Sequence, residues 1–154
     1  MKEKVLVKIK GLQIMSQVQE ENNQEENSEE TIEIINIGSY NVVGNKEYVK
    51  YDELVEGENG KCSNLIKIAD NAVEITKRGA VTAHMSFVAG EKTMTCYDTP
   101  FGNIYLGIFT RQIDILRSDG IINITIDYAL ELNYEHVSDC KVEMEISSNR
   151  DIKL

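Results

Sequence analysis

The chain has 154 residues, of which 42% are hydrophobic, and it carries a formal net charge of −10 at pH 7. A chain of this length folds as one domain with its own core, and its composition is neither collagen-like nor that of a disordered protein. Because an acidic chain with dispersed lysines and arginines repels a phosphate backbone, we expect no nucleic-acid partner.

The segment 2–18 has the alternation of a β-strand. Successive strand side chains point to opposite faces, and here apolar and basic positions alternate: Val5, Val7 and Ile9 against Lys2, Lys4, Lys8 and Lys10. The apolar positions change from odd to even numbers at Gly11, which predicts a bulge or a sharp bend. No continuous apolar run follows Met1, so we expect no targeting signal, no membrane span and no membrane partner.

Residues 19–30 form an acidic stretch without an aliphatic side chain. Six of the 26 acidic residues lie here with no lysine or arginine, which leaves −4 of the net charge to the rest of the molecule. Such a stretch buries too little apolar surface to offset the entropy lost on ordering it. We therefore predict a single domain over 1–154 with a mobile acidic loop at 19–30.

From residue 31 onward, strand-like runs alternate with short turns. Gly44-Asn45 and Asp70-Asn71 tolerate the left-handed backbone of tight hairpins, and further turns are expected at 56–61, 89–91, 98–102, 118–120 and 134–138. The runs between them are 32–43, 46–55, 63–69, 72–77, 81–87, 92–97, 103–116, 122–132 and 139–147. None of these segments has helical periodicity.

The clearest pattern lies near the end of the chain. Apolar residues occupy every second position at Ile122, Ile124, Ile126, Tyr128, Leu130 and Leu132. The run 139–147 repeats this pattern with Cys140, Val142, Met144 and Ile146. Both runs are expected to be strands with one dry face and one wet face.

The turn lengths favour one all-β architecture. Short turns make neighbouring strands antiparallel, and an antiparallel meander leaves two exposed edges unless it closes on itself. We predict an all-β antiparallel meander closed into a barrel. A sandwich is the alternative, but it needs long links between non-adjacent strands, and only the acidic stretch offers one.

Several features follow one another from about residue 51 to the C-terminus. They are Arg78-Gly79, Met85 and Phe87, the turn Tyr97-Asp98-Thr99-Pro100-Phe101-Gly102, Thr110, and Tyr128. Together they resemble the YwiB-like family of bacterial proteins. The resemblance implies a calycin-type, lipocalin-like β-barrel, here of about 8–10 strands. It implies no activity, because none is established for the family.

Candidate ligand-binding residues lie in this part of the chain. If the turn after 72–77 is Arg78-Gly79-Ala80, Arg78 sits at a barrel rim, where its guanidinium would hold an anionic ligand group or pair with a glutamate. Tyrosines supply hydroxyls to a wet cavity, although buried tyrosines bonded to the backbone give the same sequence. The residues that we select are Arg78, Tyr97, Thr110 and Tyr128.

No group of residues has the spacing of a catalytic or metal site. His84 lies near Ser86 without a nucleophile elbow, so we expect an exposed or hydrogen-bonded strand histidine, and we expect His136 to be a solvated turn residue. The three cysteines are widely separated, which is typical of reduced thiols in a cytoplasmic protein. We predict no catalytic residue, no metal site, no cofactor and a cytoplasmic location.

Two functions remain open. The first is a non-enzymatic barrel that binds a small, partly apolar molecule in its interior or at its mouth. The alternative is a structural or interaction protein with a packed core that acts through its surface, as a homodimer joined at an incompletely covered sheet. An enzyme ranks third, because no base, nucleophile and stabilising group occur together.

Overall fold

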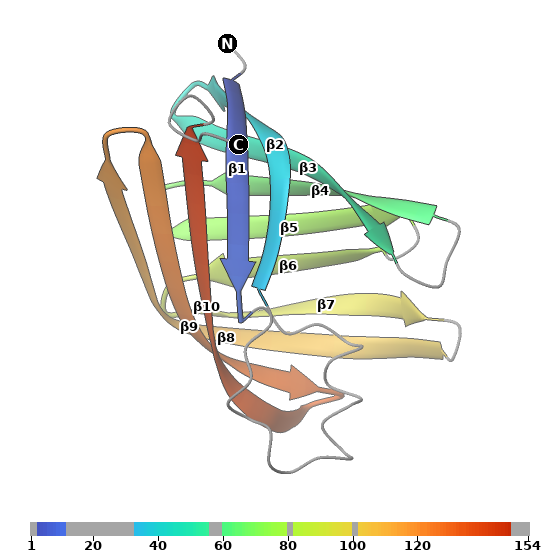
Figure 1. Cartoon of the computed structure of the whole chain (residues 1–154). Helices are drawn as coiled ribbons and strands as arrows, with labels where there is room; N and C mark the ends of the chain where they lie inside the picture. The colour runs from blue at the N-terminus through green and yellow to red at the C-terminus, as the bar shows by residue number, and fades with distance from the viewer. Residues whose placement is uncertain (1–2, 12–32, 56–59, 80–81, 100–101, 149–154) are drawn as a thin grey trace.

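The computed structural model describes residues 3–11, 33–55, 60–79, 82–99 and 102–148, which form ten β-strands (Figure 1). The strands are β1 (Glu3–Lys10), β2 (Glu33–Val43), β3 (Lys46–Val55), β4 (Gly60–Ile68), β5 (Ala72–Gly79), β6 (Ala83–Val88), β7 (Lys92–Thr99), β8 (Gly102–Ser118), β9 (Ile121–Leu132) and β10 (Glu135–Ser148). The acidic stretch 19–30, residues 12–18 and Pro100-Phe101 of the expected tight turn lie outside the described residues. Within the described ranges, no helix is long and apolar enough to cross a membrane.

The strands form one antiparallel meander that is joined at the ends of the chain. Their order is β6-β5-β4-β3-β2-β1-β10-β9-β8-β7. The first and last strands therefore pair, with Val5 opposite Ser148 and Lys10 opposite Glu143. Figure 1 shows the sheet curling into a barrel, with β1 between β10 and β2. The predicted all-β antiparallel barrel is confirmed.

The barrel is nearly closed, with a seam between β6 and β7. These strands follow one another in the chain but form the two ends of the sheet. Their connecting turn binds β8 instead: the Gly90 N–H donates to the Thr110 carbonyl at 2.8 Å, and the Thr110 N–H donates to the Glu91 carbonyl at 3.1 Å. The register of β8 against β9 shifts directly after Thr110, which marks a β-bulge. Across the seam, the Thr93 hydroxyl donates to the Ser86 carbonyl at 2.6 Å.

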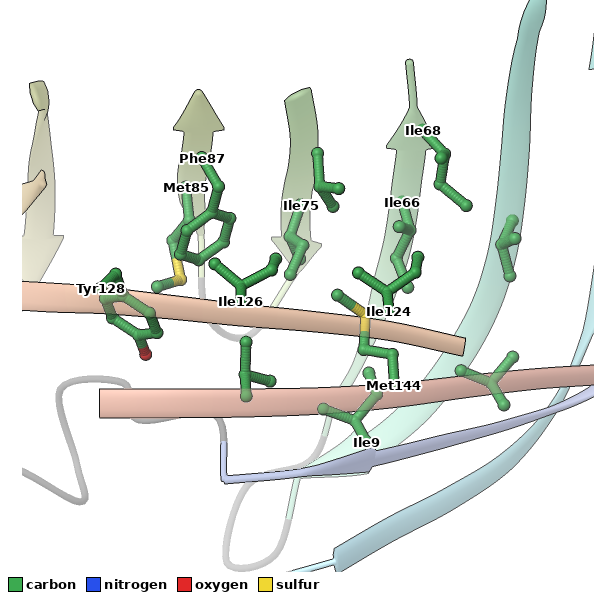
Figure 2. Close-up of a cluster of buried hydrophobic side chains, with 14 of the residues drawn as sticks. Ile9, Ile66, Ile68, Ile75, Met85, Phe87, Ile124, Ile126, Tyr128 and Met144 are labelled. Atoms are coloured by element: carbon green, nitrogen blue, oxygen red, sulfur yellow. The ribbon is translucent and has the colours of Figure 1, made fainter. Parts of the chain in front are cut away.

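The predicted dry faces line the interior. In β9 and β10, Ile124, Ile126, Tyr128, Val142 and Met144 are all buried, and the Tyr128 and Phe87 rings pack in a T-shaped arrangement with centroids 5.0 Å apart. Val5, Val7 and Ile9 of β1 are buried as well, whereas the lysines between and beside them lie on the outer face. Figure 2 shows labelled side chains of β9 and β10, such as Ile124, Ile126 and Met144, facing those of β4, β5 and β6 from the opposite wall of the barrel. Alternation with period two is therefore the main determinant of the fold.

Most expected turns and bends agree with the structure. Gly44 and Asp70-Asn71 form hairpin turns, and Gly11 ends β1 with φ +88°. A side chain at Gly11 would place its Cβ 2.3 Å from the Lys141 carbonyl oxygen, so the close approach of β10 requires glycine there.

The expected turn at 134–138 is wrong. β9 and β10 are joined at Asn133-Tyr134, whose φ angles of 50° and 73° make a two-residue hairpin. His136 consequently lies in β10, where the register shifts between His136 and Ser138. This hairpin was not predicted because it contains neither glycine nor proline, on which the prediction of most turns relied.

Candidate functional site

The structure places Arg78 on the outer face of the barrel. Val73, Ile75 and Lys77 of β5 point inward and are buried, so Arg78 has the opposite orientation and is exposed. A turn at Arg78-Gly79-Ala80 would place Ile75 opposite Ala83, whereas in the structure Ile75 lies opposite Met85. Lys77, which the sequence analysis did not select, occupies the interior position.

Thr110 and Tyr128 are cross-strand neighbours in β8 and β9, and both are completely buried. The Thr110 hydroxyl has no hydrogen-bond partner among the described residues. For Tyr97 the structure describes the backbone in β7 but not the side chain. The structure thus brings two of the four selected residues together inside the barrel and leaves Arg78 apart from them.

A buried polar cluster lies at one end of β3, β4 and β5. The Lys77 Nζ donates to the Glu53 Oε1 at 2.7 Å and to the Asn64 Oδ1 at 2.9 Å, and the Asn64 amide donates to the same Glu53 oxygen at 3.0 Å. Tyr51 lies on the same face, and burial, followed by the charge of Glu53, raises its pKa. Because each buried charge has a partner, this cluster is a satisfied structural network.

A pocket opens at the other end of the barrel, beside the start of β1 and the end of β10. Figure 1 shows these two strand ends next to each other. Its volume is about 230 Å³. Its walls come from β1, β2, β3, β10 and the β8–β9 hairpin, and the lining residues are Glu3, Val5, Tyr40, Glu47, Arg117, Ser118, Gly120, Ile121, Ile122, Ile146 and Ser148. We call this the mouth pocket. It combines an apolar floor with a polar rim.

Glu47 holds one side of the mouth pocket together. The Tyr40 hydroxyl donates to the Glu47 Oε2 at 2.6 Å, and the Arg117 Nη2 donates to the Glu47 Oε1. Arg117 is 70 residues from Glu47 and lies on β8, so this ion pair links the β8–β9 hairpin to β3 across the mouth. The Glu47 side chain is only 15% exposed, which favours a well-defined geometry.

The second carboxylate of the mouth pocket has no cationic partner among the described residues. Glu3 accepts a hydrogen bond from the Ser148 hydroxyl at 2.9 Å. The Ser148 N–H in turn donates to the Gly120 carbonyl at 2.8 Å, which joins the end of β10 to the β8–β9 hairpin. Among the described lining residues there are two carboxylates and one guanidinium, an excess of one negative charge.

Two clusters of charged groups contain the histidines, and both lie on the surface. The His84 Nδ1 is 3.0 Å from the Thr76 hydroxyl, and its Nε2 is 3.9 Å from Glu74. This confirms the expected hydrogen-bonded strand histidine. His136 and Arg111 both contact Asp139, and these hydrogen bonds, that of Arg111 first, lower its pKa. In the described ranges, no group of three His, Cys, Asp or Glu side chains is arranged to hold a metal ion.

The signal for the missed residues was their position in the alternation. Glu3 shares the inner face of β1 with Val5, Arg117 follows Ile113 and Ile115 on β8, and Lys77 follows Ile75 on β5. Each charged residue stands at the end of an apolar series with period two. Extending such a series by two residues, to the next position on the same face, identifies charged side chains at the two ends of a barrel.

A ten-stranded antiparallel barrel with a packed interior and a pocket at one mouth is the class that this geometry defines. The chain belongs to the family described as Domain of unknown function (DUF1934), whose model matches residues 13–144. It is 30% identical over 136 residues to the uncharacterized β-barrel protein YwiB of Bacillus subtilis (strain 168), covering 87% of this chain and 91% of YwiB. It also matches the crystal structure of the ywiB protein from Bacillus subtilis, with a TM-score of 0.74, 22% identity, and coverage of 96% of this chain and 92% of that chain.

The buried cluster predicts opposite outcomes for two adjacent basic residues. Lys77→Met leaves the partly buried Glu53 without its cation and should lower the free energy of unfolding by about 2–3 kcal/mol. Arg78→Met removes an exposed cation and should have little effect. Urea unfolding of both variants measures this difference. Equal losses would contradict the assigned orientation of β5, and adding Glu53→Gln to Lys77→Met should recover part of the loss.

The network around Glu47 predicts a pH dependence for Tyr40. Burial, the hydrogen bond to Glu47 and the charge of Glu47 raise the pKa of Tyr40 from 10.0 to about 12, while Arg117 lowers it by less. Because the folded-state pKa is the higher one, the stabilisation is complete below pH 10 and is lost as the pH rises to 12. The difference in free energy of unfolding between wild type and Tyr40→Phe should therefore shrink over this interval.

Ultraviolet titration of tyrosinate provides the direct readout. The wild-type curve minus the Tyr40→Phe curve should have its midpoint near pH 12, and Arg117→Gln should move this midpoint upward. A midpoint near pH 10 would show that Tyr40 does not donate to Glu47 in solution.

Proposed function

We propose that this barrel binds a small, partly apolar molecule in the mouth pocket. The observation that carries the proposal is the combination, in one pocket of about 230 Å³, of apolar Val5, Ile122 and Ile146 with the polar groups of Glu3 and Arg117. Small-molecule sites typically join an apolar surface to a few placed polar groups.

The mouth is favoured over the barrel centre because side chains occupy the centre. Ile66, Ile75, Phe87, Ile124 and Ile126 are all at most 1% exposed, and Figure 2 shows them filling the space between the walls. The interior of a small barrel is either filled by side chains or encloses a ligand. The described interior of this barrel is filled by side chains. A role for Tyr97, Thr110 and Tyr128 in binding stays a prediction.

The proposal includes a calycin-type relationship and a cytoplasmic location. The up-and-down meander of ten strands supports the first, since calycin barrels are built by this kind of closure. The cysteines support the second, since Cys62, Cys96 and Cys140 form no disulfide and two of them are buried.

A surface patch supports a second candidate function, the association of two copies of the chain. Met94, Tyr105, Phe109 and Tyr134 are each at least 40% exposed on or beside β7 and β8. The rings of Tyr105 and Tyr134 lie 5.9 Å apart. The patch lies on the outer side of the barrel, so two copies related by a twofold axis would bury their two patches against each other.

The binding proposal is tested with straight-chain alcohols, acids and amines from butyl to octyl, measured by ligand-detected NMR. We expect dissociation constants on the order of 1 mM for the best of them. Ile122→Trp fills the mouth pocket and should abolish binding, whereas Leu116→Trp adds the same bulk to an exposed position of the same hairpin and should leave binding unchanged. Absence of binding to wild type, or equal binding to Ile122→Trp, would reject the proposal.

Light scattering tests the second candidate. Wild type should have the mass of a dimer, and Phe109→Glu should convert it to a monomer because a charge in the centre of an apolar contact is costly. Leu116→Glu, which places the same charge on another exposed apolar position, should leave the dimer intact. A wild-type monomer would remove this candidate.

A further inference from the structure

We propose that the molecule bound in the mouth pocket is a small organic cation, an amine with an apolar body. This inference rests on the proposed function and specifies the chemical class of its ligand. It follows from the position and pairing of three charged side chains, Glu3, Glu47 and Arg117.

Glu47 is already compensated within the protein. Its two carboxylate oxygens are bound by different partners, Oε1 by Arg117 and Oε2 by the Tyr40 hydroxyl. A ligand that bound Glu47 would have to displace one of these groups from a carboxylate that is largely buried. Glu47 therefore shapes the wall of the pocket and is not the ligand's partner.

Glu3 is the carboxylate that remains. Its Oε2 accepts from the Ser148 hydroxyl, a neutral donor, and in the described part of the chain no cation is paired with it. A hydroxyl leaves the full negative charge of Glu3 in place at the rim. An ammonium group, which has three donors and no acceptor, complements such a carboxylate directly.

The rival ligand is an anion held by Arg117, whose side chain is half-exposed. An anion at that guanidinium would lie within the same small pocket as both Glu3 and Glu47, and only one of these charges is balanced by Arg117. At the short distances within this pocket, repulsion from a carboxylate opposes the attraction of the guanidinium. The pKa of Tyr40 agrees with this balance, because Glu47 raises it more than Arg117 lowers it and Glu3 raises it further.

The mouth pocket provides an apolar surface for the hydrocarbon part of the ligand. Val5 is paired with Gly38 of β2 and Ser148 of β10, and Ile122 and Ile146 are opposite each other on β9 and β10. Glu3 and Val5 share one face of β1, so a carboxylate and an apolar surface follow each other along the strand. A ligand with an ammonium at one end and a hydrocarbon body matches this order.

The test compares hexylamine, hexanoate and 1-hexanol, which share one hydrocarbon chain and differ in charge. Dissociation constants are measured by NMR titration of the full chain at pH 7. We expect hexylamine to bind at least tenfold more tightly than hexanoate and severalfold more tightly than 1-hexanol. Glu3→Gln should remove the advantage of hexylamine over 1-hexanol, and Arg117→Gln should preserve or increase it.

Glu143→Gln is the matched control for the overall acidity of the protein. It makes the same change in net charge on the exposed outer face of β10, opposite Lys10 at the end of β1 that lies away from Glu3. Hexylamine should bind this variant as it binds wild type. If Glu143→Gln weakens hexylamine as much as Glu3→Gln does, the preference reflects general attraction to an acidic protein and the inference is overturned.

The remaining outcomes separate the inference from the function on which it rests. Equal or tighter binding of hexanoate or 1-hexanol in wild type, lost in Ile122→Trp, would overturn the cationic ligand and retain the mouth pocket as a binding site. Failure of all three compounds to bind wild type would overturn both.

Discussion

Most of the strands that the structure describes have one buried apolar face, and curling of the single sheet brings these faces together in one interior. The inner residues of β9 and β10 pack against those of β4, β5 and β6 from the opposite wall, as Figure 2 shows. Burial of apolar surface is the dominant favourable contribution to folding. In this barrel it also fixes the register, because a shift by one residue would turn each inner face outward.

The same alternation determines where polar groups meet inside the barrel. The inner face of β3 begins with Glu47, continues with Val49 and Tyr51, and ends with Glu53. One glutamate thus reaches the mouth pocket and the other reaches Lys77 at the far end. The apolar residues in the middle of β3 separate the two glutamates. Glu53 lies in the buried cluster with Lys77, and Glu47 lines the mouth pocket.

The sequence was sufficient for the strand faces and insufficient for contacts between distant strands. Ile124 and Val142 could be assigned to the interior because period two is a local property of the chain. The pairing of Arg117 with Glu47 depends on the order of the strands around the barrel, which no local pattern contains. Arg78 was selected in place of Lys77 because a charged side chain at an inward position was not considered, although parity alone identifies it.

The seam between β6 and β7 also lay beyond a local analysis. A hairpin-like turn joins these strands, and its glycine suggested an ordinary ladder. The turn binds Thr110 of β8 instead, at the bulge where β8 bends. Whether the backbone groups near this turn pair with β6, β7 or β8 depends on how the folded sheet curves. A local sequence pattern does not contain that information.

The pairing of β1 with β10 has a consequence for synthesis of the chain. Val5 meets Ser148, so β1 leaves the ribosome long before β10, the strand with which it completes the wall. The hairpins from β2 to β9 can form from neighbouring segments, but the β1–β10 pairing requires β10 to have emerged, and the growing sheet keeps an uncovered apolar face until then. A protein of equal size with only local contacts can cover its core earlier in synthesis.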